Sequence, residues 1–451
     1  MPGLEESIKN WFLGRKMIDR ELQQSIAPHS TTSMTSLKKS YSAHRRVDYF
    51  RAIEAWVGSH QLKAKFESEH PGLILLDLLQ NRIPNHVKRV VSAAQKTSES
   101  VDYEETQFFP VDCFWSWTDN NGNAGVIRIF THYQMREIEI ACSDESRLAE
   151  ISDELDRLSV ELSIYRNKFL QVDVAEPMQD DYGHSNQAEG IQITFRKPPT
   201  VTEEQIIFDP QIKQLVDRNV ISFFRNRERL HELGLPLQRG VLFYGPPGTG
   251  KTYTCQYIHG QLKPVTTLTV TGKGLGQVRT ICSLARLLHP AVLVLEDVDL
   301  IFKSREINLY STALGEMMDE LDAFKREESV LFILTTNSIE RLEAAIKDRP
   351  GRISQCIFFG PPTRDLRIRY LIRYLRDYDA SALSMEYIAD ISDGGSQAFL
   401  EELVYRAVQI ASENNGDKIA LKDEYFKEAV DEMTGHKDQS AGSILGFRFN
   451  D

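Results

Sequence analysis

The sequence predicts an α/β fold, with a parallel sheet flanked by helices, preceded by a smaller α+β domain. An apolar stretch at residues 240–244 runs through a glycine-rich loop into a helical pattern, as in a strand followed by a helix. Two later apolar stretches, at 291–295 and 329–334, each end in polar side chains. The α+β part rests on apolar and polar residues that alternate around Trp115 and Trp117.

The composition is that of a soluble globular protein with several domains. The 451 residues exceed what one core usually organises, and 41% of them are hydrophobic and 26% charged. A net charge of -12 argues against nucleic acid as a partner, because a phosphate backbone would be repelled unless basic residues were gathered on one surface. The 5 cysteines are scattered without CxxC spacing, which predicts reduced thiols and no zinc site. No apolar run is long enough to cross a bilayer and no secretory signal is present, so we expect a cytoplasmic protein without a membrane partner.

The N-terminal part is predicted to contain both helices and a hairpin. Apolar residues at 49–57 recur at helical spacing, and helix is expected to continue to about residue 95. The alternation at 111–118, followed by a turn at 119–123, predicts a β-hairpin. Trp115 and Trp117 share a face of that hairpin with apolar neighbours, so we expect them in the core rather than on a recognition surface.

A long helix is predicted from about Asp144 to Phe169. Its apolar residues recur at steps of three and four; they are Leu148, Ile151, Leu155, Leu158 and Leu162. This spacing fits a coiled-coil seam for a partner helix, and it also fits a helix packed on its own sheet, which we favour. The polar, acidic segment that follows, between residues 175 and 190, predicts an interdomain linker.

A phosphate-binding loop is predicted directly after the strand at 240–244. The loop and the residue behind it are Gly245, Pro246, Pro247, Gly248, Thr249, Gly250, Lys251, Thr252 and Tyr253. The pattern GxxxxGK[ST] between a strand and a helix is a specific signal, because its glycines let backbone N–H groups close around the β- and γ-phosphates. Lys251 adds a point charge and the Thr252 hydroxyl can reach Mg²⁺. Nucleotide binding follows from this loop.

Acidic residues follow the second apolar strand. Glu296 and Asp297 come directly after residue 295, where carboxylates beside a phosphate loop hold Mg²⁺ through water and polarise an attacking water. Surface acids after a strand are the structural alternative. Asn337 follows the third strand, where an amide can orient the water. Further on, Arg349 and Arg352 stand three residues apart on a turn suited to reach the γ-phosphate of a neighbouring subunit, or to be a solvated loop.

Together these motifs resemble the AAA family of ATPases. GPPGTGKT, LEDVD, LGEMMDELDAF, TTN and DRPGRI stand in the order and spacing of the family, and the resemblance covers residues 199–436. The sequences of these motifs are similar to those of bacterial AAA ATPases. They are more distantly similar to those of the mitochondrial Rieske-protein translocase ATPase, whose transmembrane segment is not found here.

The resemblance implies an AAA+ module of the P-loop NTPase class with a small helical lid. It implies ATP and Mg²⁺ as cofactors, a homo-oligomeric ring, expected to be a hexamer, and ATP hydrolysis at the subunit interfaces. Carried over residue by residue, the catalytic positions are Lys251, Glu296, Asp297, Asn337, Arg349 and Arg352, and the metal-binding positions are Thr252 and Glu296. Asp322 matches an acid that lies near the subunit interface in the family.

With these assignments the whole chain can be divided. The predicted segments are a leader and Ser-rich linker at 1–43, an α+β domain for a substrate or partner at 44–175, a linker at 176–198, the large nucleotide-binding domain at 199–362, the helical lid at 363–436 and a tail at 437–451. The tail carries apolar residues and is expected either to dock on an adjacent subunit or to cover its own lid.

The sequence departs from the family in three places. The acid pair reads Glu-Asp where the family has Asp-Glu, which sets the second carboxylate about 1–1.5 Å further from the water and predicts slow hydrolysis. The segment at 271–276 lacks the aromatic residue with which unfoldases grip their substrate. Gln397, Ala398 and Phe399 stand where the lid of the family often reads Gly-Ala-Asp.

We therefore expect a ring ATPase that remodels a protein or protein complex. The alternative is an oligomeric switch or scaffold gated by nucleotide, which the exchanged acids and the missing aromatic favour. A nucleic-acid motor is a third hypothesis, resting on basic residues at 38–46 and 364–376. Solvated arginines beside an apolar stripe suffice to explain the second cluster, and this is the interpretation that we favour.

Overall fold

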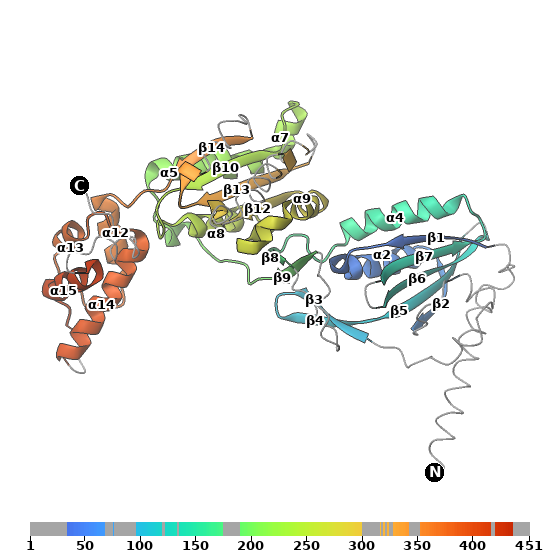
Figure 1. Cartoon of the computed structure of the whole chain (residues 1–451), viewed down its shortest axis with the longest axis horizontal. Helices are drawn as coiled ribbons and strands as arrows, with labels where there is room; N and C mark the ends of the chain where they lie inside the picture. Colours follow the sequence, from blue (N-terminus) through green and yellow to red (C-terminus); the bar gives the residue numbers. More distant parts are fainter. Residues whose placement is uncertain are drawn as a thin grey trace, which may run out of the picture. The chain divides into compact units, whose positions relative to one another are not determined.

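The chain forms two compact units, Met1–Arg166 and Asn167–Asp451, in the computed structural model shown in Figure 1. The structure describes residues 34–67, 75, 96–119, 122–132, 135–174, 190–299, 316, 319–320, 323, 328–341, 352–415 and 420–435. The C-terminal tail and most of the predicted leader lie outside these ranges. Within them, no helix combines the length and the apolar character needed to cross a membrane.

The first unit is built on an antiparallel sheet with the strand order β1-β7-β6-β5-β2. Its strands are β1 (Thr35–Ser40), β2 (Gln61–Glu67), β5 (Asp112–Thr118), β6 (Ala124–His132) and β7 (Met135–Cys142). A separate pair, β3 (Lys96–Asp102) and β4 (Glu105–Pro110), forms a hairpin. A 3-10 turn, η2 (Ala43–Arg45), leads into helix α2 (Arg46–Gly58), which packs against α4 (Arg147–Glu161). The predicted hairpin is confirmed as β5 and β6.

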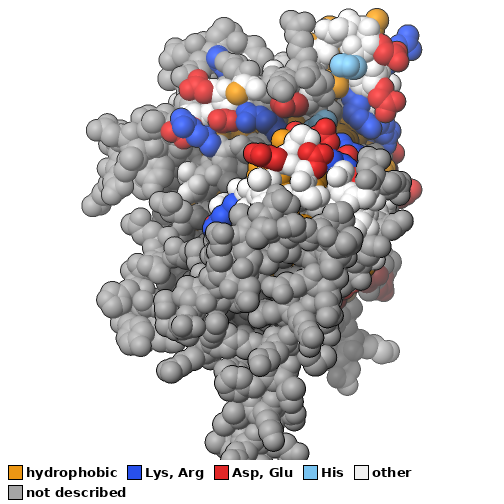
Figure 2. Space-filling view, turned by 90° about the vertical axis from the view of Figure 1, so that its right-hand side faces the viewer, with side chains coloured by type: hydrophobic (Ala, Val, Ile, Leu, Met, Phe, Trp, Pro, Cys, Tyr) orange, Lys and Arg blue, Asp and Glu red, His pale blue; other side chains and the backbone are white. Residues whose placement is uncertain are grey.

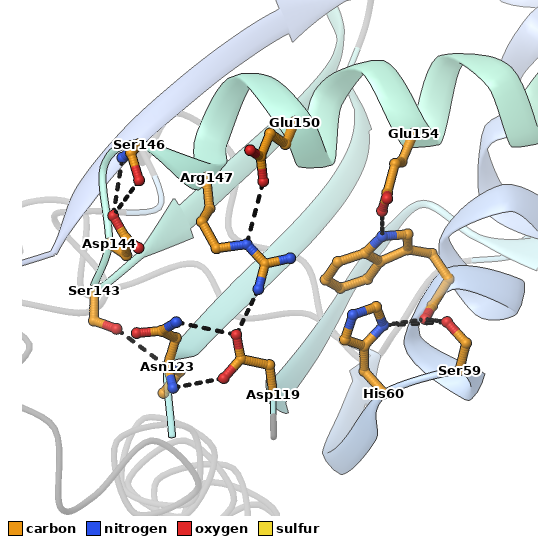
Figure 3. Close-up of polar contacts among 12 residues, drawn as sticks. Ser59, His60, Asp119, Asn123, Ser143, Asp144, Ser146, Arg147, Glu150 and Glu154 are labelled. Carbon is orange, nitrogen blue, oxygen red and sulfur yellow. Dashed lines mark hydrogen bonds and ion pairs between the residues drawn. The ribbon is translucent and has the colours of Figure 1, made fainter. Parts of the chain in front are cut away.

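The aromatic side chains of β5 fill the core of this unit, as the sequence predicted. Trp115 and Trp117 are buried, and their rings pack edge-on against Phe50 and Trp56 of α2. The indole Nε1 of Trp56 donates a hydrogen bond to Glu154 of α4 (Figure 3). Burial of such large rings is the main apolar contribution that holds the two helices on the sheet.

A buried cation lies among the other side chains of the same sheet. Arg128 of β6 donates from Nε and Nη2 to the two carboxylate oxygens of Asp112, each at 2.8 Å, and from Nη1 to Glu139 of β7 at 3.1 Å. The backbone N–H of Leu75 also donates to Glu139. All three charged side chains are at most 4% exposed, so the charge of Arg128 is neutralised inside the unit.

Several sequence predictions for this unit are corrected. The first helix ends at Gly58, because residues 61–67 form strand β2 along β5. Of the remaining stretch predicted as helix, the structure describes only Leu75, which is helical. Part of the predicted leader is strand β1, which pairs with β7. The helix predicted to reach Phe169 ends at Glu161; Asp48 accepts the backbone N–H of Ile164, and the chain then turns.

The apolar side chains in the first part of α4 pack inside the first unit. Leu148, Ile151 and Leu155 are buried, which is the packing that we favoured, whereas Leu162 is exposed. The turn after β5 is tied to the same helix. Asp119 accepts hydrogen bonds from the backbone and side chain of Asn123 and from Arg147 at the start of α4 (Figure 3).

The second unit contains a seven-stranded sheet with the order β14-β10-β13-β12-β11-β8-β9. Its strands are β8 (Phe169–Val174), β9 (Ile191–Phe195), β10 (Arg239–Tyr244), β11 (Thr266–Val270), β12 (Ala291–Leu295), β13 (Val330–Thr336) and β14 (Ile353–Phe358). All neighbours pair in parallel except β8 and β9. The central strands β12 and β13 are buried along their whole length and mostly apolar, as expected of a parallel sheet covered on both faces.

Two strands of this sheet fall outside the predicted nucleotide-binding domain. The sequence placed β8 in the N-terminal domain and β9 in the linker, yet β8 pairs with β11, and Thr269 Oγ1 donates to the carbonyl of Leu170. The boundary of the second unit therefore precedes β8. Pairing between strands so far apart in sequence leaves no local pattern that would have shown it.

Helices cover both faces of the sheet, and a helical subdomain follows it (Figure 1). The elements around the sheet are η4 (Glu203–Gln205), α5 (Pro210–Val216), η5 (Asp217–Ser222), α6 (Phe223–Arg225), α7 (Arg227–Glu232), α8 (Lys251–Leu262), η6 (Gly272–Gln277), α9 (Val278–Leu287) and η8 (Ile339–Arg341). The subdomain consists of α12 (Arg364–Tyr374), α13 (Met385–Ile391), α14 (Gln397–Asn415) and α15 (Asp423–Thr434), around a core of their apolar side chains.

Candidate nucleotide-binding site

The predicted phosphate loop connects β10 to α8 at the carboxyl ends of the parallel strands. Gly245 has a φ of 145°, and a Cβ there would lie 2.0 Å from the carbonyl oxygen of Phe359, so only glycine fits. Gly250 has a φ of 91° immediately before α8. The loop thus curls around a space at the amino end of a helix, and this cradle of backbone N–H groups fits the phosphates of a nucleotide.

Lys251 lies at the centre of the loop with its ammonium group held by neutral acceptors. Nζ donates to the carbonyl oxygens of Gly245 at 2.9 Å and Pro246 at 2.8 Å, and to Oδ1 of Asn337 at 2.8 Å. Burial lowers the pKa of Lys251 to about 8, while the nearby Asp297 and Asp299 act in the opposite direction. A cation that is largely desolvated and bonded to dipoles gains strongly from an arriving anion.

The structure brings the second acid of the pair and the predicted sensor amide together. Asn337 Nδ2 donates to Oδ1 of Asp297 at 3.0 Å, so Asn337 bridges Lys251 and Asp297. Asp297 has a φ of 49°, and its backbone N–H donates to Oγ1 of Thr335. Lysine, amide and carboxylate from three separate segments thus meet at one point. That they position an attacking water stays a prediction.

The first acid of the pair lies beside the hydroxyl of the loop. The Thr252 hydroxyl lies near enough to Glu296 to lower the pKa of its carboxyl, and the backbone N–H of Glu296 donates to the carbonyl of Val270 at 2.9 Å. Burial and the neighbouring Asp297 raise the pKa of Glu296. Hydroxyl and carboxylate oxygens are the ligands that Mg²⁺ prefers, so Thr252 and Glu296 fit the predicted metal position.

Sequence reasoning gave no role to Asp299, which the structure places behind the site. Asp299 is buried and accepts hydrogen bonds from Thr336 Oγ1 at 2.9 Å and from the backbone N–H of Asn337 at 3.1 Å. It therefore fixes the end of β13 from which Asn337 projects. Its spacing two residues after Asp297 was the only available signal, and only the adjacency of β12 and β13 gives it meaning.

A cleft runs from the phosphate loop to the helical subdomain. One half has a volume of about 480 Å³ and is lined by loop residues, Asp297, Asn337 and side chains of α12 and α14. The adjoining half, about 430 Å³, is lined largely by apolar and aromatic residues, among them Ile206, Phe208 and Tyr370. Tyr253, predicted as a binding residue, lines both halves. A half lined by the phosphate loop beside a half lined largely by aromatic and aliphatic residues suits a molecule with phosphates at one end and a flat ring at the other.

Arg352, the member of the predicted arginine pair that the structure describes, does not line this cleft. Arg352 precedes β14, where Gly240 at the start of β10 is paired with Ile353, whereas the phosphate loop follows the other end of β10. At about 3.3 Å per residue, the five residues from Gly240 to Gly245 span about 16 Å. Arg349 and Asp322 lie outside the described residues, as does most of the LGEMMDELDAF segment.

Comparison with known proteins places this site in a family context. Residues 241–361 match the family model "ATPase family associated with various cellular activities (AAA)". An "ATP-dependent zinc metalloprotease FtsH 2" of Thermoanaerobacter sp. (strain X514) is 26% identical over 296 residues, covering 62% of this chain and 56% of that relative.

Other relatives match over a shorter range. "ATP-dependent zinc metalloprotease FtsH 2" of Salinibacter ruber is 31% identical over 46% of this chain and 32% of its own length. "ATP-dependent zinc metalloprotease YME1 homolog" of Schistosoma mansoni is 30% identical over 45% of this chain and 32% of its own length. The chain thus spans about half of the first relative and about a third of these two.

Proposed function

We propose that this chain carries an AAA+ ATPase module, which uses ATP and Mg²⁺, and that the module drives the remodelling of a protein or protein complex from a hexameric ring. The observation that carries the proposal is the bridge from Lys251 through Asn337 to Asp297, with Thr252 and Glu296 beside it. In this proposal Lys251 binds the phosphates, Thr252 and Glu296 hold Mg²⁺, and Asp297 with Asn337 positions the water.

The position of Arg352 supports assembly into a ring. Arg352 lies at the end of β10 and β14 that is remote from the phosphate loop of the same chain, about 16 Å away along the strand. An arginine side chain is too short to span that distance. Arg349 and Arg352 are therefore proposed to reach the γ-phosphate bound by a neighbouring subunit, where a guanidinium stabilises transition-state charge.

The relatives support a protein as the target. Their names describe ATP-dependent proteases, so their ATP hydrolysis serves work on polypeptides. We do not extend the peptidase chemistry to this chain, because the sequence contains no His-Glu-x-x-His motif. The α+β first unit is the proposed docking domain for the target, and the five free cysteines support a cytoplasmic location.

One observation favours the alternative of a nucleotide-gated switch. In the family, the segment after β11 carries an aromatic grip for substrate, whereas here it forms η6, packed on β8. A Cβ at Gly274 would lie 3.0 Å from the carbonyl oxygen of Val172, so the backbone of η6 closely approaches that strand. A loop packed on the sheet in this way suits transmission of a nucleotide-dependent movement better than gripping a threaded chain.

The hypothesis of a nucleic-acid motor loses its main support. In the first unit, Lys38 pairs with Glu137, Lys39 with Asp156, and Arg46 with Glu99. In α12, Arg364 pairs with Asp390, and the buried Arg367 with Asp393. Acidic and basic side chains also lie side by side on the described part of the face in Figure 2. These cations are already matched by acids, which weakens any attraction for a phosphate backbone.

The proposal is tested with Asp297→Asn, which removes the base but keeps the phosphate loop. We expect this variant to retain ATP and to lose hydrolysis by about 100-fold. Affinity capture with the ATP-loaded variant from the native cell then identifies the bound protein, with Lys251→Ala as the matched variant that does not load ATP.

The captured protein is then added to the wild type in a steady-state ATPase assay. A remodeller is expected to turn over ATP faster in its presence and to change the assembly state of that protein. Capture without faster turnover would favour the switch, and unchanged hydrolysis by Asp297→Asn would refute the assignment of the base.

A further inference from the structure

Gln397, the first residue of α14, lies where the two halves of the nucleotide cleft meet. It lines the polar half together with Lys251 and Asp297, and it lines the apolar half together with Ile206 and Tyr253. In the AAA family this position is often glycine, which has no side chain to offer. The amide in the cleft is therefore a feature of this chain rather than of the family's nucleotide site.

The backbone of the helical subdomain holds Gln397 against the phosphate loop. The N–H of Ala398 donates to the carbonyl of Gly248 at 3.2 Å, and the N–H of Phe399 donates to Ser396 Oγ at 3.2 Å. Phe399 and Leu400 are fully buried in the core of the subdomain, so the start of α14 is anchored on both sides. Phe399 is thus a core residue and offers no polar group to a ligand.

The side chain of Gln397 extends over Gly250. A Cβ built on Gly250 would lie 2.7 Å from Oε1 and 3.1 Å from Nε2 of Gln397, so the amide faces the backbone of the loop. Within the part of the chain that the structure describes, no hydrogen bond to this amide is formed. Gln397 is partly buried, and an amide placed in a cleft without a partner gains from a ligand that presents both a donor and an acceptor.

The apolar half of the cleft is fixed by the lid as well. Tyr370 of α12 donates from its hydroxyl to the carbonyl of Ile207 at 2.5 Å, and Arg373 donates to the carbonyl of Gln205. Residues 206–208 are therefore held by the lid, and they line the same space as Gln397, which suits the flat base.

We propose that Gln397 determines base specificity by recognising the Hoogsteen edge of adenine. Adenine offers there an acceptor, N7, and a donor, the N6 amino group, which match the Nε2 donor and Oε1 acceptor of a glutamine side chain. Guanine offers two acceptors, N7 and O6, so it satisfies only the donor of the amide. The inference rests on ATP binding at this site and concerns which nucleotide the site prefers.

The test measures equilibrium binding, without hydrolysis, of the Mg²⁺ complexes of ADP, 7-deaza-ADP and GDP to the full chain. 7-deaza-ADP has C–H in place of N7. We expect the wild type to bind ADP about fivefold more tightly than 7-deaza-ADP, the loss of one hydrogen bond. Gln397→Ala is expected to bind ADP about tenfold more weakly than the wild type and no longer to discriminate between ADP and 7-deaza-ADP.

Two further variants make the result specific. Gln409→Ala changes a glutamine of the same helix whose amide bonds to Glu413 instead, and it is expected to behave as the wild type. Gln397→Glu keeps the size of the side chain but has no donor for N7, so it also loses the discrimination against 7-deaza-ADP, and it decides the question if Gln397→Ala does not fold. Equal weakening of all three nucleotides by Gln397→Ala would indicate a contact with sugar or phosphate and overturn the proposal, as would unchanged affinity.

Discussion

The two units each bury a cation, and the two cations are treated in opposite ways. Arg128 of the first unit forms a bidentate pair with Asp112 and a third bond to Glu139, so its charge is neutralised by carboxylates. Lys251 of the second unit is bonded to two carbonyl oxygens and one amide oxygen. These carboxylates raise the pKa of Arg128, whereas burial lowers that of Lys251.

The difference separates a charge that serves folding from a charge kept ready for a ligand. A closed ion network has nothing to gain from an added anion, and removing its cation leaves buried carboxylates without a counterion. Burying a cation among dipoles costs desolvation free energy when the protein folds, and a bound phosphate then offsets that cost through its opposite charge. Replacing the two cations should therefore separate stability from nucleotide binding.

The largest effect is expected for Lys251→Ala. It removes the charge aimed at the phosphates, so kcat/KM for ATP should fall on the order of 1000-fold, about 4 kcal/mol, while the thermal unfolding of the chain changes little. In the wild type, affinity for ATP should decline as the pH rises past about 8, because Lys251 loses its proton there. Steady-state ATPase assays and ATP binding across pH 7 to 10 check both statements.

The control is Lys263→Ala, at the exposed end of the same helix, which should keep full turnover. Mixing inactive Lys251→Ala subunits with inactive Arg352→Ala subunits should restore part of the activity, because some interfaces then combine an intact loop with an intact arginine. Retained turnover in Lys251→Ala alone would contradict the role of the loop.

Arg128→Met is expected to have the complementary phenotype. Asp112 and Glu139 then lose the counter-charge of Arg128 while they stay buried, so the free energy of unfolding of the first unit should fall by about 3 kcal/mol. Affinity for ADP should not change. All 4 tryptophans belong to the first unit, so their fluorescence during urea denaturation reports its stability separately. A variant with wild-type stability would show that the ion network does not hold this sheet together.

The smallest effect is expected for Asp48→Asn, which tests a buried anion with few charged partners. Asp48 accepts bonds from Ser163 Oγ and the N–H of Ile164, with Arg45 at 3.8 Å, and burial raises the pKa of Asp48 to about 6. The folded state then binds the proton more tightly than the unfolded state, so stability from this group is present near pH 4 and lost as the pH rises to 6.

Asparagine keeps the shape and cannot ionise, so the variant should be more stable than the wild type at pH 7, on the order of 1 kcal/mol. The advantage should disappear near pH 4. Tryptophan fluorescence in urea at pH 4 and pH 7 measures the difference, and an equal effect of the substitution at both values would refute the raised pKa.

The sequence by itself determined the features whose residues are contiguous. The phosphate loop, the strands at 240–244 and 291–295, and the hairpin around Trp115 each have a local pattern, because glycine positions, apolar runs and alternation reflect backbone geometry over a few residues. The family motifs extended this to ATP and Mg²⁺ and to the acids beside the loop.

Only the tertiary structure decided which distant residues meet. Asp299 contacts the end of β13 because β12 and β13 are neighbours. Gln397 lies in the cleft because the start of α14 is hydrogen-bonded to Gly248. Strand β8 pairs with β11, so it is part of the second sheet and not of the N-terminal domain. None of these contacts leaves a local pattern, since hydrogen bonds and packing between remote segments depend on how the chain folds back on itself. The nucleotide-binding motifs could therefore be predicted from the sequence. The residue that positions Asn337, Asp299, and the residue proposed to select the base, Gln397, could be identified only from the fold.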